Sequence, residues 1–171
     1  MKKILACILS FLFLVVPALS ESASPEEAVS DLYDRIEMSA RKDELDLQYA
    51  CTETEDNYFL YENEVMCVFY ESGRLQAKLR AFESVLDVAP VADIPLDKLP
   101  SYKQGMKIDE VTGAFGCEGF EIMKINLADE DDAGVRRVLV WKTETGVHVQ
   151  ALFELDDNEW VLFAIAEGKE K

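Results

Sequence analysis

The clearest pattern of apolar and polar positions lies in the last third of the chain. Four runs rich in β-branched and aromatic residues, at 120–127, 135–143, 147–155 and 159–166, are separated by short segments of turn-forming residues. The third run places one set of apolar side chains on a single side: Val147, Val149, Ala151, Phe153 and Leu155. This alternation predicts a four-stranded antiparallel meander with one face toward a core.

The first third instead follows helical spacing. Ala28, Leu32 and Ile36 recur every four residues, which predicts an amphipathic helix over residues 25–40. Ser24 can cap that helix, because Glu27 follows three positions later in a capping-box arrangement. A short second helix is predicted over residues 44–50.

The middle of the chain gives mixed signals. Residues 58–61 and 65–70 read as two strands joined by a turn at residues 62–64, with one long helix from Glu64 onward as the competing interpretation. A further helix is predicted over residues 74–88, since four large apolar residues share one helical face: Leu75, Leu79, Phe82 and Leu86.

Residues 89–116 contain three prolines, Pro90, Pro95 and Pro100. Proline rules out a central strand or an uninterrupted helix there. We therefore expect residues 89–116 to form a loop-rich connection, and a connection of this length is often functional.

The start of the chain has the pattern of an export signal. Two lysines precede a thirteen-residue stretch, residues 4–16, in which only Ser10 is polar. That stretch is shorter than the roughly 20 apolar residues that span a bilayer. We expect a signal peptide over residues 1–20, cleaved after Ser20 or alternatively after Ser22 or Ala23, and one domain over residues 21–171; a retained membrane anchor is the alternative. Lipidation at Cys7 is disfavoured, because Cys7 precedes most of the apolar stretch.

Net charge restricts the possible partners. The full chain carries −17, and without Lys2 and Lys3 it would have 15 basic against 34 acidic residues, a net charge of −19. Such a chain repels phosphate backbones and anionic membrane surfaces, so a nucleic-acid partner is excluded. A basic protein partner would be attracted, although plain solubility also accounts for acids scattered along the whole chain.

Three cysteines would remain after cleavage: Cys51, Cys67 and Cys117. An exported protein meets oxidising conditions, so we expect a disulfide between Cys51 and Cys67 and a free Cys117. The spacing of these cysteines, and their distance in sequence from the single histidine, argue against a zinc site.

Few residues are candidates for chemistry. His148 is expected to be an exposed strand histidine rather than a base, and Glu154 lies about 20 Å further along the same strand face. The acidic run from Asp129 to Asp132 does not match the ligand spacing of a calcium loop, so we expect a solvated turn and no metal. Trp141 and Trp160 could line a pocket, but tryptophans on strands are more often core residues.

The predicted order of two helices, a hairpin, a third helix and four strands resembles the NTF2-like superfamily, the cystatin-like α+β cone. Two segments carry the resemblance, SPEEAVSDLYDRIEMSARKDELD (residues 24–46) and GVHVQALFELDDNEWVLFAIAEG (residues 146–168). The resemblance implies an α+β fold in which N-terminal helices pack on a curved antiparallel sheet around a conical pocket. No residue here matches a catalytic position of that family, and fold alone does not choose a function.

Together these patterns favour an exported, periplasmic or secreted domain without catalysis or cofactor. It would bind a basic protein partner or a small apolar ligand through the concave face of the sheet or through the proline-rich connection. The alternative is an NTF2-like pocket enzyme of the isomerase or hydrolase type, with a buried Asp or Tyr as its acid or base.

Overall fold

The structure, a computed structural model, describes residues 31–54, 57–81, 86–129 and 134–168. The predicted signal peptide, its cleavage site, Cys7 and the predicted start of the first helix lie outside these ranges. No helix within the described ranges is long and apolar enough to cross a membrane.

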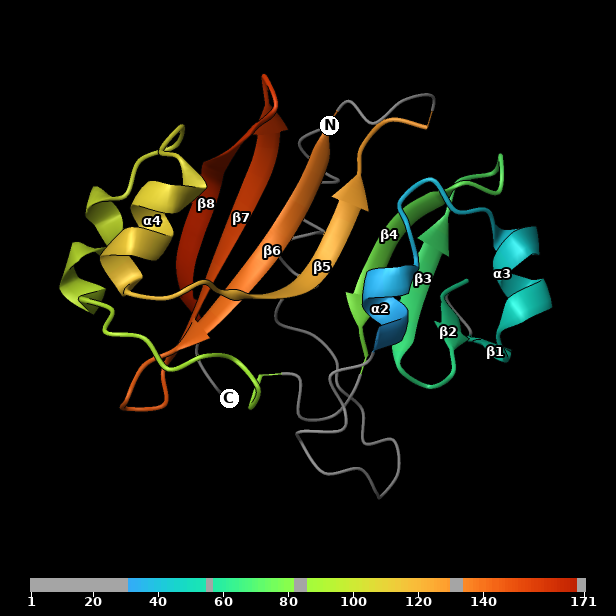
Figure 1. Ribbon diagram of the computed structural model, residues 1–171, viewed down its shortest axis with the longest axis horizontal. Helices are drawn as coiled ribbons and strands as arrows, with labels where there is room; N and C mark the ends of the chain where they lie inside the picture. The colour runs from blue at the N-terminus through green and yellow to red at the C-terminus, as the bar shows by residue number, and fades with distance from the viewer. Residues whose placement is uncertain (1–30, 55–56, 82–85, 130–133, 169–171) are drawn as a thin grey trace.

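A single antiparallel sheet dominates the described residues (Figure 1). Its eight strands lie in the order of the chain, so each strand pairs with the one that follows it. Their bounds are β1 Cys51–Glu53, β2 Phe59–Tyr61, β3 Val65–Phe69, β4 Leu75–Arg80, β5 Phe120–Asn126, β6 Val135–Lys142, β7 His148–Asp156 and β8 Glu159–Gly168.

Short helices precede each group of four strands. Helices α2 (Asp31–Arg35) and α3 (Lys42–Gln48) come before β1–β4, and the 3₁₀ helix η1 (Leu96–Ser101) and helix α4 (Ile108–Phe115) come before β5–β8. The chain is therefore two successive units of helices followed by a four-stranded meander, joined edge to edge through β4 and β5.

Both helical groups cover the same face of the sheet, and the strand register shows this directly. Lys78 on β4, which bonds to α2, lies in one cross-strand row with Lys124, Arg137, Phe153 and Leu162. Directly paired residues point to the same side, and the last two of this row pack with α4. We call this side the helix-bearing face; in Figure 1 it is toward the viewer.

Two separate cores lie between this face and the helices. Under α4 and η1 the core includes Val111, Phe115, Trp141 and Phe153, all at most 1% exposed. Under α2 and α3 a second core is formed by Leu32, Tyr33, Ile36, Leu45, Tyr61, Val65, Cys67 and Leu75. Between these two cores lies the middle of the helix-bearing face. Among the described residues, this part of the face has no large apolar cluster.

The opposite face of the sheet carries a third apolar cluster. Its buried members are Ala89, Ile122, Met123, Ile125, Val138, Val140 and Leu152. Strands β6 and β7 therefore have apolar clusters on both faces, which explains why their side chains alternate between two apolar environments.

The predicted fold class is wrong. We expected an α+β cone in which N-terminal helices pack on a curved sheet, whereas the described residues form mainly one eight-stranded antiparallel sheet with a few short helices. The error arises because residues 75–80 form a strand and not a helix, and this strand joins β1–β3 to β5–β8 in one sheet. The family resemblance itself stays a prediction, since a sheet of this kind is not diagnostic of the NTF2-like superfamily.

The predicted helix over residues 74–88 is replaced by strand β4. Leu75 and Leu79 fit a helical period, yet they belong to different faces of the sheet, with Leu75 in the core under α2 and Leu79 in the cluster on the opposite face. Pairing with β3 and β5 supplies the backbone hydrogen bonds here, so tertiary context overrides the local pattern. Residues 82–85 lie outside the described ranges.

The long connection at residues 89–116 is only partly loop. It contains η1, whose Leu99 is buried, and α4, which begins after Lys107 and ends at Gly116. The Lys107 backbone N–H donates to Glu110 Oε2 at 2.8 Å, and Gly116 adopts a left-handed conformation with φ of 79°. These are the usual start and stop signals of a helix.

Candidate functional site

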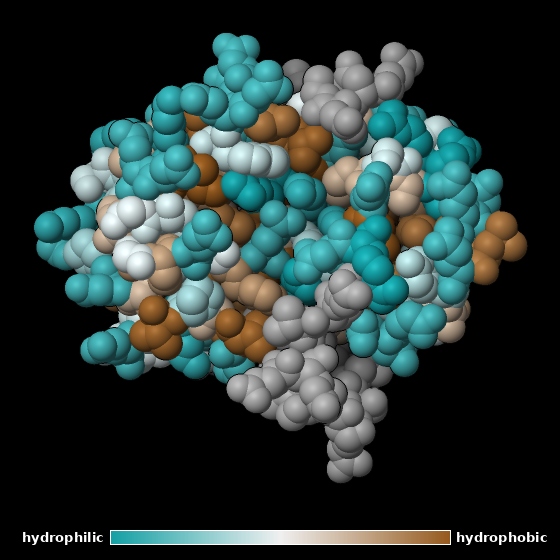
Figure 2. Space-filling model, viewed as in Figure 1, coloured by the Kyte–Doolittle hydropathy of each residue, from teal (hydrophilic) through white to brown (hydrophobic). Residues whose placement is uncertain are grey.

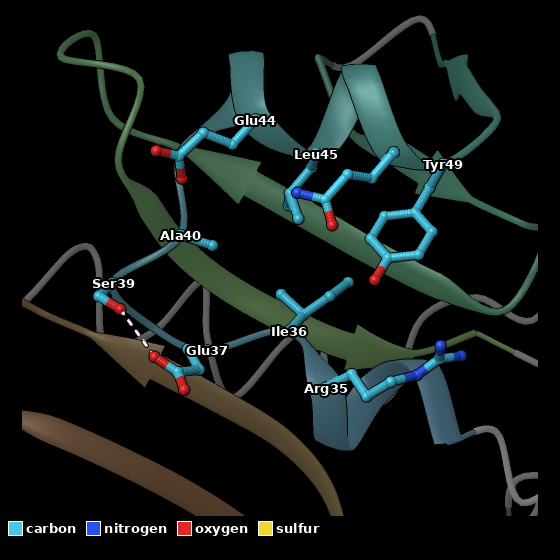
Figure 3. A pocket seen from close by; sticks show the side chains of 9 residues that line it. Arg35, Ile36, Glu37, Ser39, Ala40, Glu44, Leu45 and Tyr49 are labelled. Atoms are coloured by element: carbon cyan, nitrogen blue, oxygen red, sulfur yellow. Dashed lines mark hydrogen bonds between the residues drawn. The ribbon is translucent and has the colours of Figure 1, made fainter.

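A shallow pocket lies between α2 and α3 and encloses about 210 Å³ (Figure 3). Nine residues line it: Arg35, Ile36, Glu37, Ser39, Ala40, Glu44, Leu45, Gln48 and Tyr49. Ile36 and Leu45 are buried, whereas the charged residues at the rim are exposed. Ser39 Oγ donates to Glu37 Oε2 at 3.3 Å, but both side chains are exposed and no histidine or cysteine lines the pocket. The pocket therefore lacks the buried nucleophile and base that catalysis requires.

Asp46 on α3 and Tyr61 on β2 are two titratable groups held in a structural contact. Tyr61 Oη donates to Asp46 Oδ1 at 2.7 Å and so ties β2 to α3. Burial raises the pKa of Tyr61 well above its ordinary value. Desolvation acts to raise the pKa of Asp46, but hydrogen bonds from Lys42 and Tyr61 outweigh it and lower that pKa. At neutral pH Tyr61 is protonated and Asp46 is ionised, so neither has the pKa of a general base poised near neutrality.

His148 is buried, not exposed as the sequence predicted. Only 4% of it is accessible, and it lies between Lys142 and Gly168 in the sheet. Its Nε2 has no hydrogen-bond partner among the described residues. Glu154, the carboxylate on the same strand face, pairs instead with Arg136 at 2.9 Å. The structure therefore does not bring His148 and Glu154 together.

The acidic run after β5 lies partly outside the described residues, which include Asp129 but not residues 130–133. Asp129 Oδ1 accepts a hydrogen bond from Ser72 Oγ at 2.7 Å. Within the described ranges no three His, Cys, Asp or Glu residues gather as a metal site would require.

The structure shows no disulfide between Cys51 and Cys67, where the sequence predicted one. Cys51, Cys67 and Cys117 are free thiols in the structure. Cys51 lies on β1 and Cys67 on β3, with β2 between them. Two strand spacings amount to about 10 Å, beyond the roughly 7 Å that a disulfide can span between Cα atoms.

The two tryptophans have different environments. Trp141 is fully buried in the core under α4, where it meets the ring of Phe115 edge-on at 5.0 Å, in agreement with the predicted core position. Trp160 is half-buried, and the guanidinium of Arg137 lies over its ring at 4.3 Å. Trp160 thus borders the middle of the helix-bearing face.

Three cations occupy directly paired positions on adjacent strands at this place. Lys78 on β4 pairs with Lys124 on β5, and Lys124 pairs with Arg137 on β6. We call these three residues the basic row. Directly opposed side chains lie about 5 Å apart at their Cβ atoms, and like charges in such positions destabilise a sheet.

The basic row is only partly neutralised. Glu121 Oε1 lies 3.7 Å from Lys124 Nζ, and Glu121 Oε2 lies 3.8 Å from an Arg137 terminal nitrogen. The same carboxylate accepts a hydrogen bond from Tyr33 Oη at 3.0 Å. Beside the row, Arg80 pairs with Asp34 at 3.0 Å.

The buried end of the basic row is fixed to helix α2. Lys78 Nζ donates to the carbonyl oxygens of Tyr33 and Ile36 at 2.5 and 2.6 Å, so it caps the end of that helix. Burial, together with the charge of Lys124, lowers the pKa of Lys78 to about 8. Lys124 and Arg137 are more accessible, with 29% and 21% of their side chains exposed.

Figure 2, in the view of Figure 1, shows hydrophilic side chains across the middle of the helix-bearing face, between the α4 side and the α2 side. Sequence reasoning missed this cluster, because β4, which carries Lys78, was predicted as a helix and lies far from β5 and β6 in the chain. The one available signal is local: Lys78 and Arg80 alternate with Ala77 and Leu79, as expected of a strand with a charged face.

Comparison with known proteins adds no assignment. No protein-family model matches the chain. No curated protein matches it either.

Proposed function

We propose that the chain is an exported, non-catalytic binding domain whose protein partner docks on the helix-bearing face of the sheet, over the basic row. The observation that carries this proposal is the placement of Lys78, Lys124 and Arg137 on neighbouring strands in a protein of net charge −17. The same cross-strand row continues into Phe153 and Leu162, which are buried and apolar.

Lys78 has a structural role as the cap of α2, but stability does not account for the cations at Lys124 and Arg137. Apolar residues at these positions would extend the core that covers the rest of the helix-bearing face, whereas opposed cations repel one another. Positions at which a destabilising residue replaces the expected apolar one in this way are typically functional. A half-buried tryptophan beside an arginine also has the composition of a binding hot spot.

The export half of the proposal depends on residues 1–20, whose pattern is that of a signal peptide. Intact-mass measurement of the protein purified from its native host tests it. We expect a mass that lacks residues 1–20, and a mass that includes them would contradict export with cleavage.

The described residues favour a protein partner over a small apolar ligand or a substrate. The pocket of Figure 3 has exposed charged residues around its rim, and an apolar ligand would leave those charges partly desolvated. The alternative of a pocket enzyme needs a buried acid or base in a closed apolar cavity, and no observation on the described residues favours it.

Site-specific photocrosslinking in the native compartment tests where the partner binds. A crosslinker at Glu118 reports on the helix-bearing face, because Glu118 is exposed and close enough for its charge to act on Arg137. A crosslinker at Gln150 is the control for the opposite face, where Gln150 is half-buried and pairs with Val140. We expect a discrete protein adduct from Glu118 and none from Gln150. Equal adducts from both positions, or none from Glu118, would contradict the proposal.

A further inference from the structure

The geometry points to a more specific role for the basic row: we propose that Arg137, Lys124 and Trp160 form a recognition site for a side-chain carboxylate on an acidic segment of the protein partner. This inference rests on the proposed function and names the chemistry of the partner.

Arg137 is presented in a way that suits a carboxylate. Its guanidinium lies 4.3 Å from the centre of the Trp160 ring, which fixes the plane of the donors. Its Nε is buried and has no hydrogen-bond partner among the described residues, so a partner could approach only the terminal nitrogens, one of which makes a long 3.8 Å contact with Glu121. The two terminal nitrogens of a planar guanidinium can bind a carboxylate through two parallel hydrogen bonds.

Charge balance leaves room for one further anion. The three cations of the basic row and Arg80 face three carboxylates, because Glu121 and Glu118 act on the row and Asp34 is engaged by Arg80. Glu121 is also held by the Tyr33 hydroxyl, which anchors it toward α2. A further carboxylate beside Arg137 and Lys124 would relieve the repulsion between these two directly paired cations.

Whole-molecule charge selects the kind of anion. At −17 the protein repels nucleic acids and anionic membranes over long distances. At moderate salt, screening limits the interaction between exposed charges to about 10 Å. One or two carboxylates of a folded partner that dock beside the basic row therefore interact mainly with its cations. The local charge thus favours an acidic contact, although the net charge alone predicts a basic partner.

Arg136 provides a matched control on the neighbouring position of β6. Its guanidinium also stacks on an aromatic ring, that of Phe163 at 4.1 Å, and its Nε also lacks a hydrogen-bond partner among the described residues. It points to the opposite face, however, and pairs with Glu154 at 2.9 Å. Arg136→Gln and Arg137→Gln therefore change charge and side chain identically on opposite faces.

The test uses ¹⁵N-labelled, natively processed protein and a capped peptide of three Glu-Ser repeats, with a Gln-Ser peptide as the neutral probe. We expect the Glu-Ser peptide to shift the Trp160 indole and Arg137 Nε–H signals saturably, and the Gln-Ser peptide to leave them unchanged. Arg137→Gln should weaken binding by about tenfold or more, the loss of one charge-assisted pair. Arg136→Gln should change it by less than about twofold. Lys124→Gln, at a partly exposed position, should weaken binding by about threefold.

Three results would overturn the inference: no shift at Trp160 or Arg137, an equal loss in Arg136→Gln, or inorganic phosphate binding at the same signals as tightly as the Glu-Ser peptide. Failure here is distinguishable from failure of the proposed function. If Glu118 still crosslinks a partner while the peptide does not bind, docking on this face stands and carboxylate recognition falls.

Discussion

Lys78 is a charged residue at a buried position of the sheet, where the sequence pattern alone would favour an apolar side chain. It is 4% exposed, caps α2 through two carbonyl oxygens and lies 4.2 Å from the Tyr33 ring centre. Its pKa falls from 10.5 to about 8 because burial disfavours the charged ammonium. Lys78 therefore couples the stability of the fold to pH.

The sign of this coupling is testable with Lys78→Met. Between pH 8 and 10 the unfolded chain retains a proton on Lys78 that the folded protein has released, so the contribution of Lys78 to stability rises with pH. We expect the free energy of unfolding of the wild type, relative to Lys78→Met, to increase by on the order of 2 kcal/mol over this interval. Urea titrations of both proteins at pH 8 and 10 measure it, and a flat or falling difference would contradict a lowered pKa.

Gly119 is required by a close approach. A Cβ atom at this position would lie 2.6 Å from two ring atoms of Trp141, which is fully buried and cannot move aside. We expect Gly119→Ala to lower the free energy of unfolding by about 2 kcal/mol. Gly113→Ala is the control, because Gly113 lies within α4 and an added Cβ meets no atom within 4 Å. That change should stabilise by about 0.5–1 kcal/mol. Thermal or urea unfolding of the two variants measures these changes. A similar loss of stability in both would contradict the predicted clash with Trp141.

The thiols should react in the order of their exposure. Cys51 is exposed, whereas Cys67 is buried and burial raises its pKa to about 12. We expect iodoacetamide at pH 8.5 to modify Cys51 at least about tenfold faster than Cys67 in the folded protein, and both in urea. Peptide mass mapping without reductant measures how much of each cysteine has been modified. If neither cysteine reacts until a reductant is added, the disulfide first predicted from the sequence exists after all.

At the scale of elements, alternation and turn chemistry predicted the last four strands, because each run has one buried side and ends in a recognisable turn. Asp157 and Asn158, for example, both adopt positive φ between β7 and β8. The strands at residues 59–61 and 65–69 and helix α3 were also predicted close to their observed positions. Strand β4 was missed because Leu75 and Leu79 have a helical spacing that a strand can also accommodate, and only pairing with β3 and β5 decides between the two. Helix α4 was missed because three prolines upstream dominated the interpretation, although Glu110 and Gly116 mark its ends.

The two edge strands should differ in mobility. Strand β1 is three residues long and fully exposed. On the outer edge of β8, Gly105 donates to the Leu162 carbonyl oxygen at 2.8 Å and Leu162 donates to the Met106 carbonyl oxygen at 2.7 Å. We expect the amides of β1 to exchange at least about a hundredfold faster than that of Leu162, because few buried contacts hold β1. Hydrogen exchange followed by NMR measures this, and equal protection at both edges would contradict it.

At the scale of the whole molecule, contacts around Glu121 join the two units across β4 and β5. Tyr33 from α2 donates to the Glu121 carboxylate, and Arg80 Nε donates to the Glu121 carbonyl oxygen at 2.9 Å. The residues of this contact are separated by 41 to 88 positions in sequence, so no periodicity or spacing could have predicted them. The same separation explains why the basic row, which surrounds Glu121, was invisible before the fold was known.

Tyr33→Phe tests this connection. Removing the hydroxyl leaves Glu121 without its buried neutral donor, and we expect the free energy of unfolding to fall by about 1.5 kcal/mol. Tyr102→Phe is the matched control, because the structure shows no hydrogen-bond partner for its hydroxyl among the described residues, and it should be close to neutral. Urea unfolding of both variants measures the difference. An equal effect of the two substitutions would mean that the hydroxyl of Tyr33 does not stabilise the fold.

The unequal edges of the sheet also limit how copies of this protein can associate. The outer side of β8 is already occupied by residues 105–107, so it offers no free backbone groups near Leu162 to an incoming strand. A second copy that paired through β1 would bring its own β8, covered near Leu162, to the outside of the joined sheet. Further strand addition at β8 would have to avoid this covered stretch, which disfavours the open-ended polymerisation that leads to fibres.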